Sequence, residues 1–236
     1  MPTPSIPDRW SVPSRLARHV DHTLLRPTAV PVDFERLCDE AVRYGFWSVC
    51  VPSGCVKLVA GKLRGSGVRI CTVVGFPLGY SSSPAKRAEA GLAVQDGADE
   101  IDMVMNIGAF KGGEYGLVSG EIRDIASDCK RNGKLLKVIL ECCYLTDEEK
   151  VIAARLAESM GADYVKTSTG FGTSGATVED VSLLHESLAG TAKVKASGGI
   201  DSLDKALAML NAGADRLGTS SGRRIMEELA HLNNSR

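Results

Sequence analysis

Lys166 and Asp102 occupy the same position of an internal repeat, and an amine and a carboxylate placed together can carry out proton and carbonyl chemistry. In each repeat a glycine follows a helix-like stretch and leads into an apolar strand. The four segments begin at Gly45, Gly97, Gly161 and Gly213, and their sixth residues are Cys50, Asp102, Lys166 and Gly218. Because a lysine is almost never fully buried without a partner, this placement predicts a functional lysine, with a solvated lysine at a strand end as the structural alternative.

A second lysine, Lys195, also lies near the end of a predicted strand. If the ammonium groups of Lys166 and Lys195 lie close together, each destabilises the other and the pKa of one falls. A neutral amine can then attack a carbonyl carbon at neutral pH, which is the requirement for Schiff-base catalysis. Asp102 could move protons or orient a water beside the imine. It could also neutralise one lysine as a structural ion pair, and the two roles are compatible.

Small residues dominate three loops that follow the last three predicted strands. Glycine N–H groups, hydroxyls and a following helix N-terminus suit a phosphate dianion, and loops after the seventh and eighth strands are the usual phosphate position in barrels. Ordinary tight turns would explain any one of these loops but explain three adjacent ones poorly. The candidate substrate-binding residues in these loops are Thr169, Gly170, Gly172, Gly198, Gly199, Gly218, Ser220 and Ser221.

Four further residues are weaker candidates for the substrate site. Asp21 and Thr23 would complete the mouth from the first strand. Cys50 could face the substrate, although a small buried hydrophobe is the commoner role of such a cysteine. Lys137 on the fifth strand is as consistent with a paired charge lining the barrel as with a direct catalytic part. The four histidines and seven cysteines show no metal-ligand spacing, so we expect neither a metal nor a cofactor.

The elements that must position these residues alternate between short strands and helices. We expect strands over residues 20–24, 47–51, 69–74, 100–105, 135–141, 164–167, 192–196 and 216–218. Strands that alternate with helices imply parallel connections, and eight such units without a long insertion favour a closed (β/α)₈ TIM barrel over an open sheet. The length of 236 residues suits one such α/β domain, since a barrel needs about 250 residues.

The expected domain organisation is simple. Residues 1–13, which contain four prolines, form a flexible N-terminal extension, and residues 14–236 form the barrel. An extra helix over residues 8–19 precedes the first strand. Because barrel interiors are layered and each layer is drawn from alternate strands, the repeat predicts Asp102 and Lys166 at similar height near the C-terminal mouth.

Composition narrows the class of partner. The chain carries 28 Lys+Arg against 29 Asp+Glu, which does not favour nucleic acid or an anionic membrane as the partner. No stretch approaches the about 20 apolar residues of a membrane span, and the N-terminus lacks the apolar core of a signal peptide. An odd number of cysteines without C-x-x-C spacing is typical of reduced thiols. We therefore expect a cytoplasmic protein with a small-molecule partner.

These motifs resemble those of the deoxyribose-phosphate aldolases, which are class I aldolases on a (β/α)₈ barrel. The matching segments are residues 21–25, 48–52, 74–79, 100–104, 136–141, 165–171 and 194–200. The resemblance implies that Lys166 forms the Schiff base, that Asp102 and Lys195 serve a proton relay, and that the loop glycines and serines surround the phosphate. It further implies a homodimer that reversibly cleaves 2-deoxy-D-ribose 5-phosphate to D-glyceraldehyde 3-phosphate and acetaldehyde in nucleotide catabolism.

The chain departs from the pattern of some members at two places. Phe171 stands where some have a further lysine, and residues 233–236 replace a terminal segment whose tyrosine can reach the active site. Both departures bear on phosphate affinity and on proton transfer. Two alternatives remain, namely a lysine-based aldolase for another phosphorylated aldehyde and a non-catalytic sugar-phosphate sensor. The sequence disfavours the sensor, because binding a phosphate needs no lysine pair with an aspartate.

Overall fold

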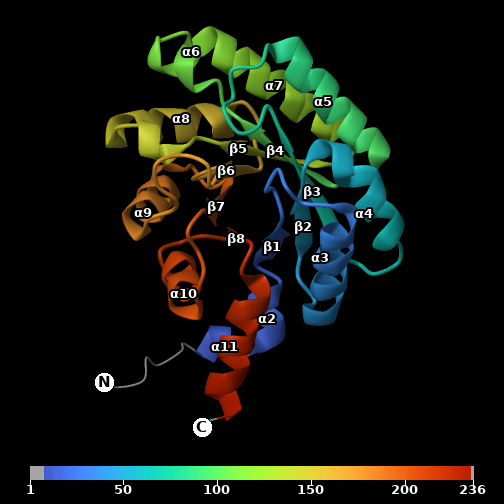
Figure 1. Cartoon of the computed structure of the whole chain (residues 1–236). Helices are drawn as coiled ribbons and strands as arrows, with labels where there is room; N and C mark the ends of the chain where they lie inside the picture. Colours follow the sequence, from blue (N-terminus) through green and yellow to red (C-terminus); the bar gives the residue numbers. More distant parts are fainter. Residues whose placement is uncertain (1–7, 235–236) are drawn as a thin grey trace.

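Eight strands pair in parallel in the order of the sequence, and the eighth pairs with the first to close a barrel (Figure 1). The computed structural model describes residues 8–234. The strands are β1 Val20–Thr23, β2 Ser48–Val51, β3 Arg69–Val74, β4 Glu100–Val104, β5 Leu135–Ile139, β6 Tyr164–Lys166, β7 Lys193–Ser197 and β8 Arg216–Thr219. The predicted (β/α)₈ TIM barrel is confirmed.

Helices surround the barrel and cover its outer face (Figure 1). They are α3 Pro31–Tyr44, α4 Val56–Lys62, α5 Ser83–Asp96, α7 Tyr115–Arg131, α8 Asp147–Ser159, α9 Val178–Ser187, α10 Leu203–Asn211 and α11 Gly222–Asn234. Outward-facing strand residues such as Val49, Ile101 and Leu217 belong to the large apolar core. The helix predicted over residues 53–64 begins with a 3₁₀ turn, η1 Ser53–Cys55, before α4. Two short elements that we did not predict lie in the loops, namely α6 Ile107–Lys111 and η2 Cys142–Tyr144.

The N-terminal segment contains two short helices, α1 Asp8–Ser11 and α2 Pro13–Ala17, where we predicted one helix. Pro13 explains the break, because a proline disfavours the helical conformation of the residue before it. Val12 accordingly has extended backbone angles, φ −86° and ψ 112°. Helix α2 packs beside α11 (Figure 1). Of the flexible extension predicted for residues 1–13, residues 1–7 lie outside the described residues, and the flexibility stays a prediction.

An aspartate at the third position of three repeats fixes the register of neighbouring strands. Each carboxylate accepts a hydrogen bond from a backbone N–H of the preceding strand, and the N–H of the same aspartate donates to the carbonyl of that partner residue. The pairs are Asp99 with Ile70, Asp163 with Leu136 and Asp215 with Val194. In these three repeats the aspartate therefore joins the start of its own strand to the preceding strand.

The inner face of the barrel is polar and layered, since alternate strand residues point inward. The lowest layer comes from the even strands, the middle layer from the odd strands, and the upper layer from the even strands again. In that order the layers are Ser48, Glu100, Tyr164 and Arg216; Asp21, Cys71, Lys137 and Lys195; and Cys50, Asp102, Lys166 and Gly218. Asp102 and Lys166 share a layer, as the repeat predicts. Ionisable groups thus take the place of the branched aliphatic residues that usually fill such barrels.

A fully buried ion pair joins α5 to α7. Lys86 Nζ lies 2.7 Å from Glu121 Oε2 and donates to the carbonyl of Val104 at 2.8 Å. Gly75, at φ +61°, passes over the lysine stem, where a Cβ would come within 2.7 Å of Lys86 Cε. The absence of a side chain at Gly75 therefore makes room for the lysine that ties both helices to the end of β4.

Removing one member of this pair should destabilise the fold strongly. Glu121→Ala leaves the Lys86 ammonium buried without its counter-ion, so we expect the free energy of unfolding to fall by about 3–5 kcal/mol in urea denaturation. The double variant Lys86→Met/Glu121→Leu removes both charges and should recover most of that loss. A single variant within about 1 kcal/mol of wild type would contradict this view of the pair.

Candidate active site

Asp102 lies inside the barrel and accepts hydrogen bonds from three lysines on three successive strands. Its Oδ1 is 2.7 Å from Nζ of Lys137, and its Oδ2 is 2.8 Å from Nζ of both Lys166 and Lys195. All four side chains are buried, with Lys166 at 3% exposure and the other three at 0%. The structure therefore brings together the three residues that the sequence singled out and places Lys137 beside them.

Two further carboxylates, Asp21 and Glu100, hold this cluster from below. Lys195 Nζ donates to Asp21 Oδ2 at 2.5 Å, and Arg216 donates to Asp21 Oδ1 at 2.8 Å. Lys137 Nζ lies 2.6 Å from Glu100 Oε2. We did not predict Glu100 and Arg216. The repeat contained the signal, because both occupy its fourth position, two residues before the strand-end position that we examined.

The charges inside the barrel balance when one lysine is neutral. Four cations, Lys137, Lys166, Lys195 and Arg216, face three carboxylates, those of Asp21, Glu100 and Asp102. Lys137 and Lys195 each pair with at least two of the carboxylates, whereas Lys166 pairs with Asp102 alone. Of the three lysines, Lys166 therefore makes the fewest ion pairs.

Electrostatics favour the charged forms of Asp102, Lys137 and Lys195. Burial acts to raise the pKa of Asp102, but Lys137, Lys166 and Lys195 hold it well below its ordinary value. Burial likewise acts to lower the pKa of Lys137 and of Lys195, but Asp102 and the other nearby acidic groups raise both well above the ordinary lysine value. The sequence predicted that the pKa of one of Lys166 and Lys195 falls. Lys195 is not that lysine, because the carboxylates of Asp102 and Asp21 lie beside it.

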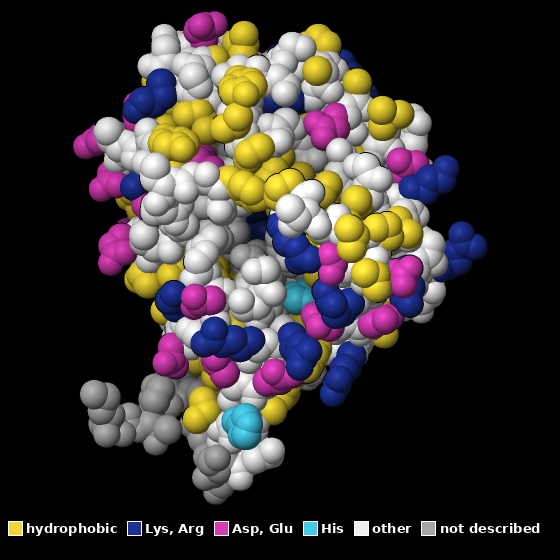
Figure 2. Space-filling view, in the orientation of Figure 1, with side chains coloured by type: hydrophobic (Ala, Val, Ile, Leu, Met, Phe, Trp, Pro, Cys, Tyr) yellow, Lys and Arg dark blue, Asp and Glu magenta, His cyan; other side chains and the backbone are white. Residues whose placement is uncertain are grey.

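A cavity of about 420 Å³ opens at the C-terminal ends of the strands. Of the three lysines, only Lys166 lines it. The predicted residues on its wall are Thr23, Thr169, Gly170, Gly198, Gly199, Gly218, Ser220 and Ser221. In Figure 2 dark blue Lys and Arg side chains show near the centre of the face, with white side chains and backbone to the left and below and yellow hydrophobic side chains above.

The wall formed by the last three loops has the features of an anion site. Gly170, Gly198 and Gly199 have φ between 76° and 87°, a left-handed conformation that glycine adopts without strain. Helix α11 begins at Gly222, so the positive end of its dipole lies at this wall. Arg26, which we did not predict, also lines the cavity and donates to Asp33. Arg26 directly follows residues 21–25, the first of the segments that resemble the aldolases.

Gly172 does not line the cavity. A Cβ there would lie 2.7 Å from the Cys143 sulfur and 3.2 Å from the Glu141 carboxyl carbon, so Gly172 packs behind the loop. Glu141 has a left-handed backbone, φ 56°, and its buried carboxylate accepts hydrogen bonds from the N–H and the hydroxyl of Thr169. Glu141 therefore anchors the loop that carries the cavity residues.

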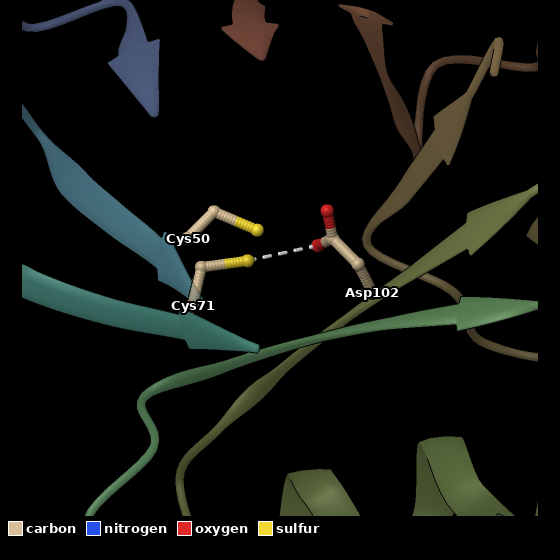
Figure 3. A group of neighbouring side chains, drawn as sticks. All are labelled: Cys50, Cys71 and Asp102. Carbon is tan, nitrogen blue, oxygen red and sulfur yellow. Dashed lines mark hydrogen bonds between the residues drawn. The ribbon is translucent and has the colours of Figure 1, made fainter. Parts of the chain in front are cut away.

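Cys50 also lies outside the cavity wall, inside the barrel beside Cys71 (Figure 3). The two cysteines and Val73 form a small apolar cluster against Leu25 and Phe76. Ligand atoms of Cys50, Cys71 and Asp102 lie within 4.8 Å of one another, as do those of Asp21, Cys71 and Glu100. Lysine or arginine already pairs with every carboxylate in these groups, so a metal ion would have to displace a cation of the cluster.

Comparisons with known proteins agree along almost the whole chain. Residues 16–228 match the family described as DeoC/LacD family aldolase. A deoxyribose-phosphate aldolase of Finegoldia magna is 52% identical over 212 residues, which cover 90% of this chain and 99% of that protein. One of Thermococcus gammatolerans is 50% identical over 214 residues, covering 90% and 95%. The deoxyribose phosphate aldolase of Aeropyrum pernix, solved as a tetramer, is 35% identical, with a TM-score of 0.90 over 95% of both chains.

Proposed function

The chain belongs to the DeoC/LacD family of aldolases. From this premise we propose that the protein binds 2-deoxy-D-ribose 5-phosphate in its cavity and reversibly cleaves it to D-glyceraldehyde 3-phosphate and acetaldehyde. The observation that carries the proposal is the placement of Lys166. Its amine is bound to Asp102 inside the barrel, and yet its side chain lines the cavity. Lys166 alone of the three lysines thus combines contact with the cluster and access for a substrate.

Lys166 is the nucleophile in this mechanism. Its neutral amine attacks the carbonyl carbon of the open-chain sugar, and loss of water gives an imine. The hydroxyl of the third carbon then gives its proton to the relay described below, and the bond between the second and third carbons breaks. The protonated imine accepts the electron pair of that bond and becomes an enamine, and D-glyceraldehyde 3-phosphate is released. Protonation of the resulting enamine and hydrolysis then release acetaldehyde and restore the amine.

Asp102 and Lys195 form the proton relay. The same oxygen, Asp102 Oδ2, lies 2.8 Å from Lys166 Nζ and 2.8 Å from Lys195 Nζ. Protons can therefore pass between the reacting amine and Lys195 along two hydrogen bonds. Lys137 on the other carboxylate oxygen fixes the orientation of Asp102. In this role Lys137 is a positioning residue.

The phosphate of the substrate binds at the wall formed by Gly170, Gly198, Gly199, Ser220 and Ser221. Backbone N–H groups, serine hydroxyls and the start of α11 supply donors and positive potential there. Arg26 adds a cation at the same cavity. The phosphate would thereby hold the sugar with its carbonyl end at Lys166.

We also propose that the chain acts in deoxyribose phosphate catabolism as a cytoplasmic homodimer, without a nucleic-acid or membrane partner. The balanced composition and the family resemblance support this assignment. Among the described residues, no helix is both long enough and apolar enough to cross a bilayer. Light scattering should give about twice the chain mass of 25.0 kDa, and a monomeric or tetrameric mass would contradict the dimer.

Trapping the imine tests the role of Lys166 directly. Acetaldehyde with borohydride should attach one ethyl group to Lys166 and abolish acetaldehyde release, because reduction makes the imine linkage permanent. Peptide mapping by mass spectrometry locates the group. Lys166→Ala should be inactive, and Asp102→Asn should lose roughly 10²–10⁴-fold in turnover.

Lys137→Met is the matched control, since it removes a lysine of the same cluster that does not line the cavity. It should turn over more slowly but still be ethylated at Lys166. Ethylation at Lys137 or Lys195 of the wild type, or an active Lys166→Ala variant, would refute the mechanism.

Placing a carboxylate at the phosphate wall tests substrate binding. Ser221→Asp should raise KM for deoxyribose phosphate roughly tenfold or more, because like charges meet. KM for unphosphorylated 2-deoxyribose should change less. Ser202→Asp is the control, since it puts the same charge at the N-cap of α10, outside the cavity wall. Equal losses on both substrates would show that this wall does not bind the phosphate.

A further inference from the structure

Cys50 and Cys71 lie side by side inside the barrel on adjacent strands, and both side chains point toward Asp102 (Figure 3). They are register partners of β2 and β3, and their sulfur atoms lie within 4.8 Å of each other and of an Asp102 carboxylate oxygen. Adjacent strands lie about 4.7–4.9 Å apart, within the about 4.4–6.8 Å that separates the Cα atoms of a disulfide. Rotation of the two side chains can therefore bring the sulfurs into bonding distance without moving a strand.

The surroundings of the two thiols favour Cys50 as the one that reacts first. Burial, the Cys50 thiol and the Asp102 carboxylate raise the pKa of Cys71. The Cys71 sulfur donates to Asp102 Oδ1 at 3.1 Å and lies 3.3 Å from Lys137 Nζ. The neighbouring Cys71 thiol lowers the pKa of Cys50, and although burial opposes this, Lys195 and Lys166 lower it further. Thiolates next to lysines are the reactive form of cysteine.

A small oxidant has a short route to this pair. Both cysteines are fully buried, but the partly buried Leu25 packs against them and also lines the cavity. A peroxide in the cavity is therefore separated from the sulfurs by one side chain. We propose that Cys50 and Cys71 form a modification site, which peroxides convert into a disulfide that reversibly inactivates the enzyme.

The reaction balances with hydrogen peroxide as the oxidant. The Cys50 sulfur attacks one peroxide oxygen, the O–O bond breaks, and the leaving hydroxide takes the thiol proton to become water. The resulting sulfenic acid is attacked by the Cys71 sulfur. The S–O bond breaks, the departing hydroxide takes the Cys71 proton, and a second water leaves. Two thiols are oxidised to one disulfide, and one peroxide is reduced to two waters.

Inactivation follows from the contacts that Cys71 loses, and this part rests on the proposed function. The disulfide has no S–H to donate to Asp102, and its bond to Cys50 draws the sulfur away from Lys137. Asp102 then loses a fixed hydrogen bond on the oxygen that Lys137 also holds. Because small displacements of relay groups reduce turnover strongly, we expect at least a tenfold loss of kcat.

The experiment treats the reduced full-length protein with hydrogen peroxide and follows acetaldehyde release. Free thiols are then alkylated, and the disulfide is mapped by mass spectrometry without reduction. We expect a Cys50–Cys71 linkage that forms in step with the loss of activity, and dithiothreitol should restore both. The linkage is read from mass alone, so it can be assessed even if deoxyribose phosphate proves not to be the substrate.

Variants distinguish this pair from the other thiols. Cys71→Ala and Cys50→Ala, each normalised to its own reduced activity, should resist peroxide. Cys55→Ser and Cys143→Ser are matched controls, because these partly exposed thiols are open to unspecific oxidation, and both variants should stay sensitive. The inference is overturned if the pair remains reduced, if the linkage forms without loss of activity, or if Cys71→Ala is inactivated like the wild type. Mapping on the wild type decides the matter if a variant does not fold.

Discussion

The interior of this barrel depends on the ion pairs that the carboxylate of Asp102 makes with three lysines. Three lysine ammonium groups without counter-ions could not be buried together, since each buried charge costs several kcal/mol unless it is paired. Asp102 accepts a hydrogen bond from each of the three ammonium groups. One carboxylate cannot balance three positive charges, and Asp21 and Glu100 supply the further negative charges. The same contacts stabilise the barrel and hold the reactive amine, so stability and chemistry depend on one network.

Much of this arrangement could be predicted from the sequence, because it is periodic. The alternation of strands and helices predicted the closed barrel, and the repeat predicted that Asp102 and Lys166 share a layer. Residues far apart in the chain could be placed together because a barrel assigns equivalent repeat positions to equivalent heights. The three loops of small residues also meet at one cavity.

The parts that sequence analysis missed depend on contacts that periodicity does not specify. Lys137 pairs with three carboxylates, those of Asp21, Glu100 and Asp102, whereas Lys195 pairs with two. An isolated lysine in an apolar strand does not reveal from the sequence which carboxylates it pairs with. The pKa argument for Lys166 and Lys195 considered only the two cations. Asp102 contacts both lysines and Asp21 contacts Lys195, and these carboxylates raise the pKa of Lys195. In the sequence Gly172 resembles the other glycines of its loop. Its packing against Glu141 and Cys143 could not be predicted, because those residues lie in a different segment of the chain, after β5.

Asp21 bears on how the polypeptide becomes active during synthesis. It stands on the first strand, whereas its two nearest cations, Arg216 and Lys195, stand on the last two strands, and only the more distant Lys137 lies on the fifth. A nascent chain on the ribosome therefore holds this carboxylate without its two nearest counter-ions until almost the entire sequence has emerged. Ring closure and assembly of the catalytic charges become one event, and a partly synthesised barrel has no competent centre.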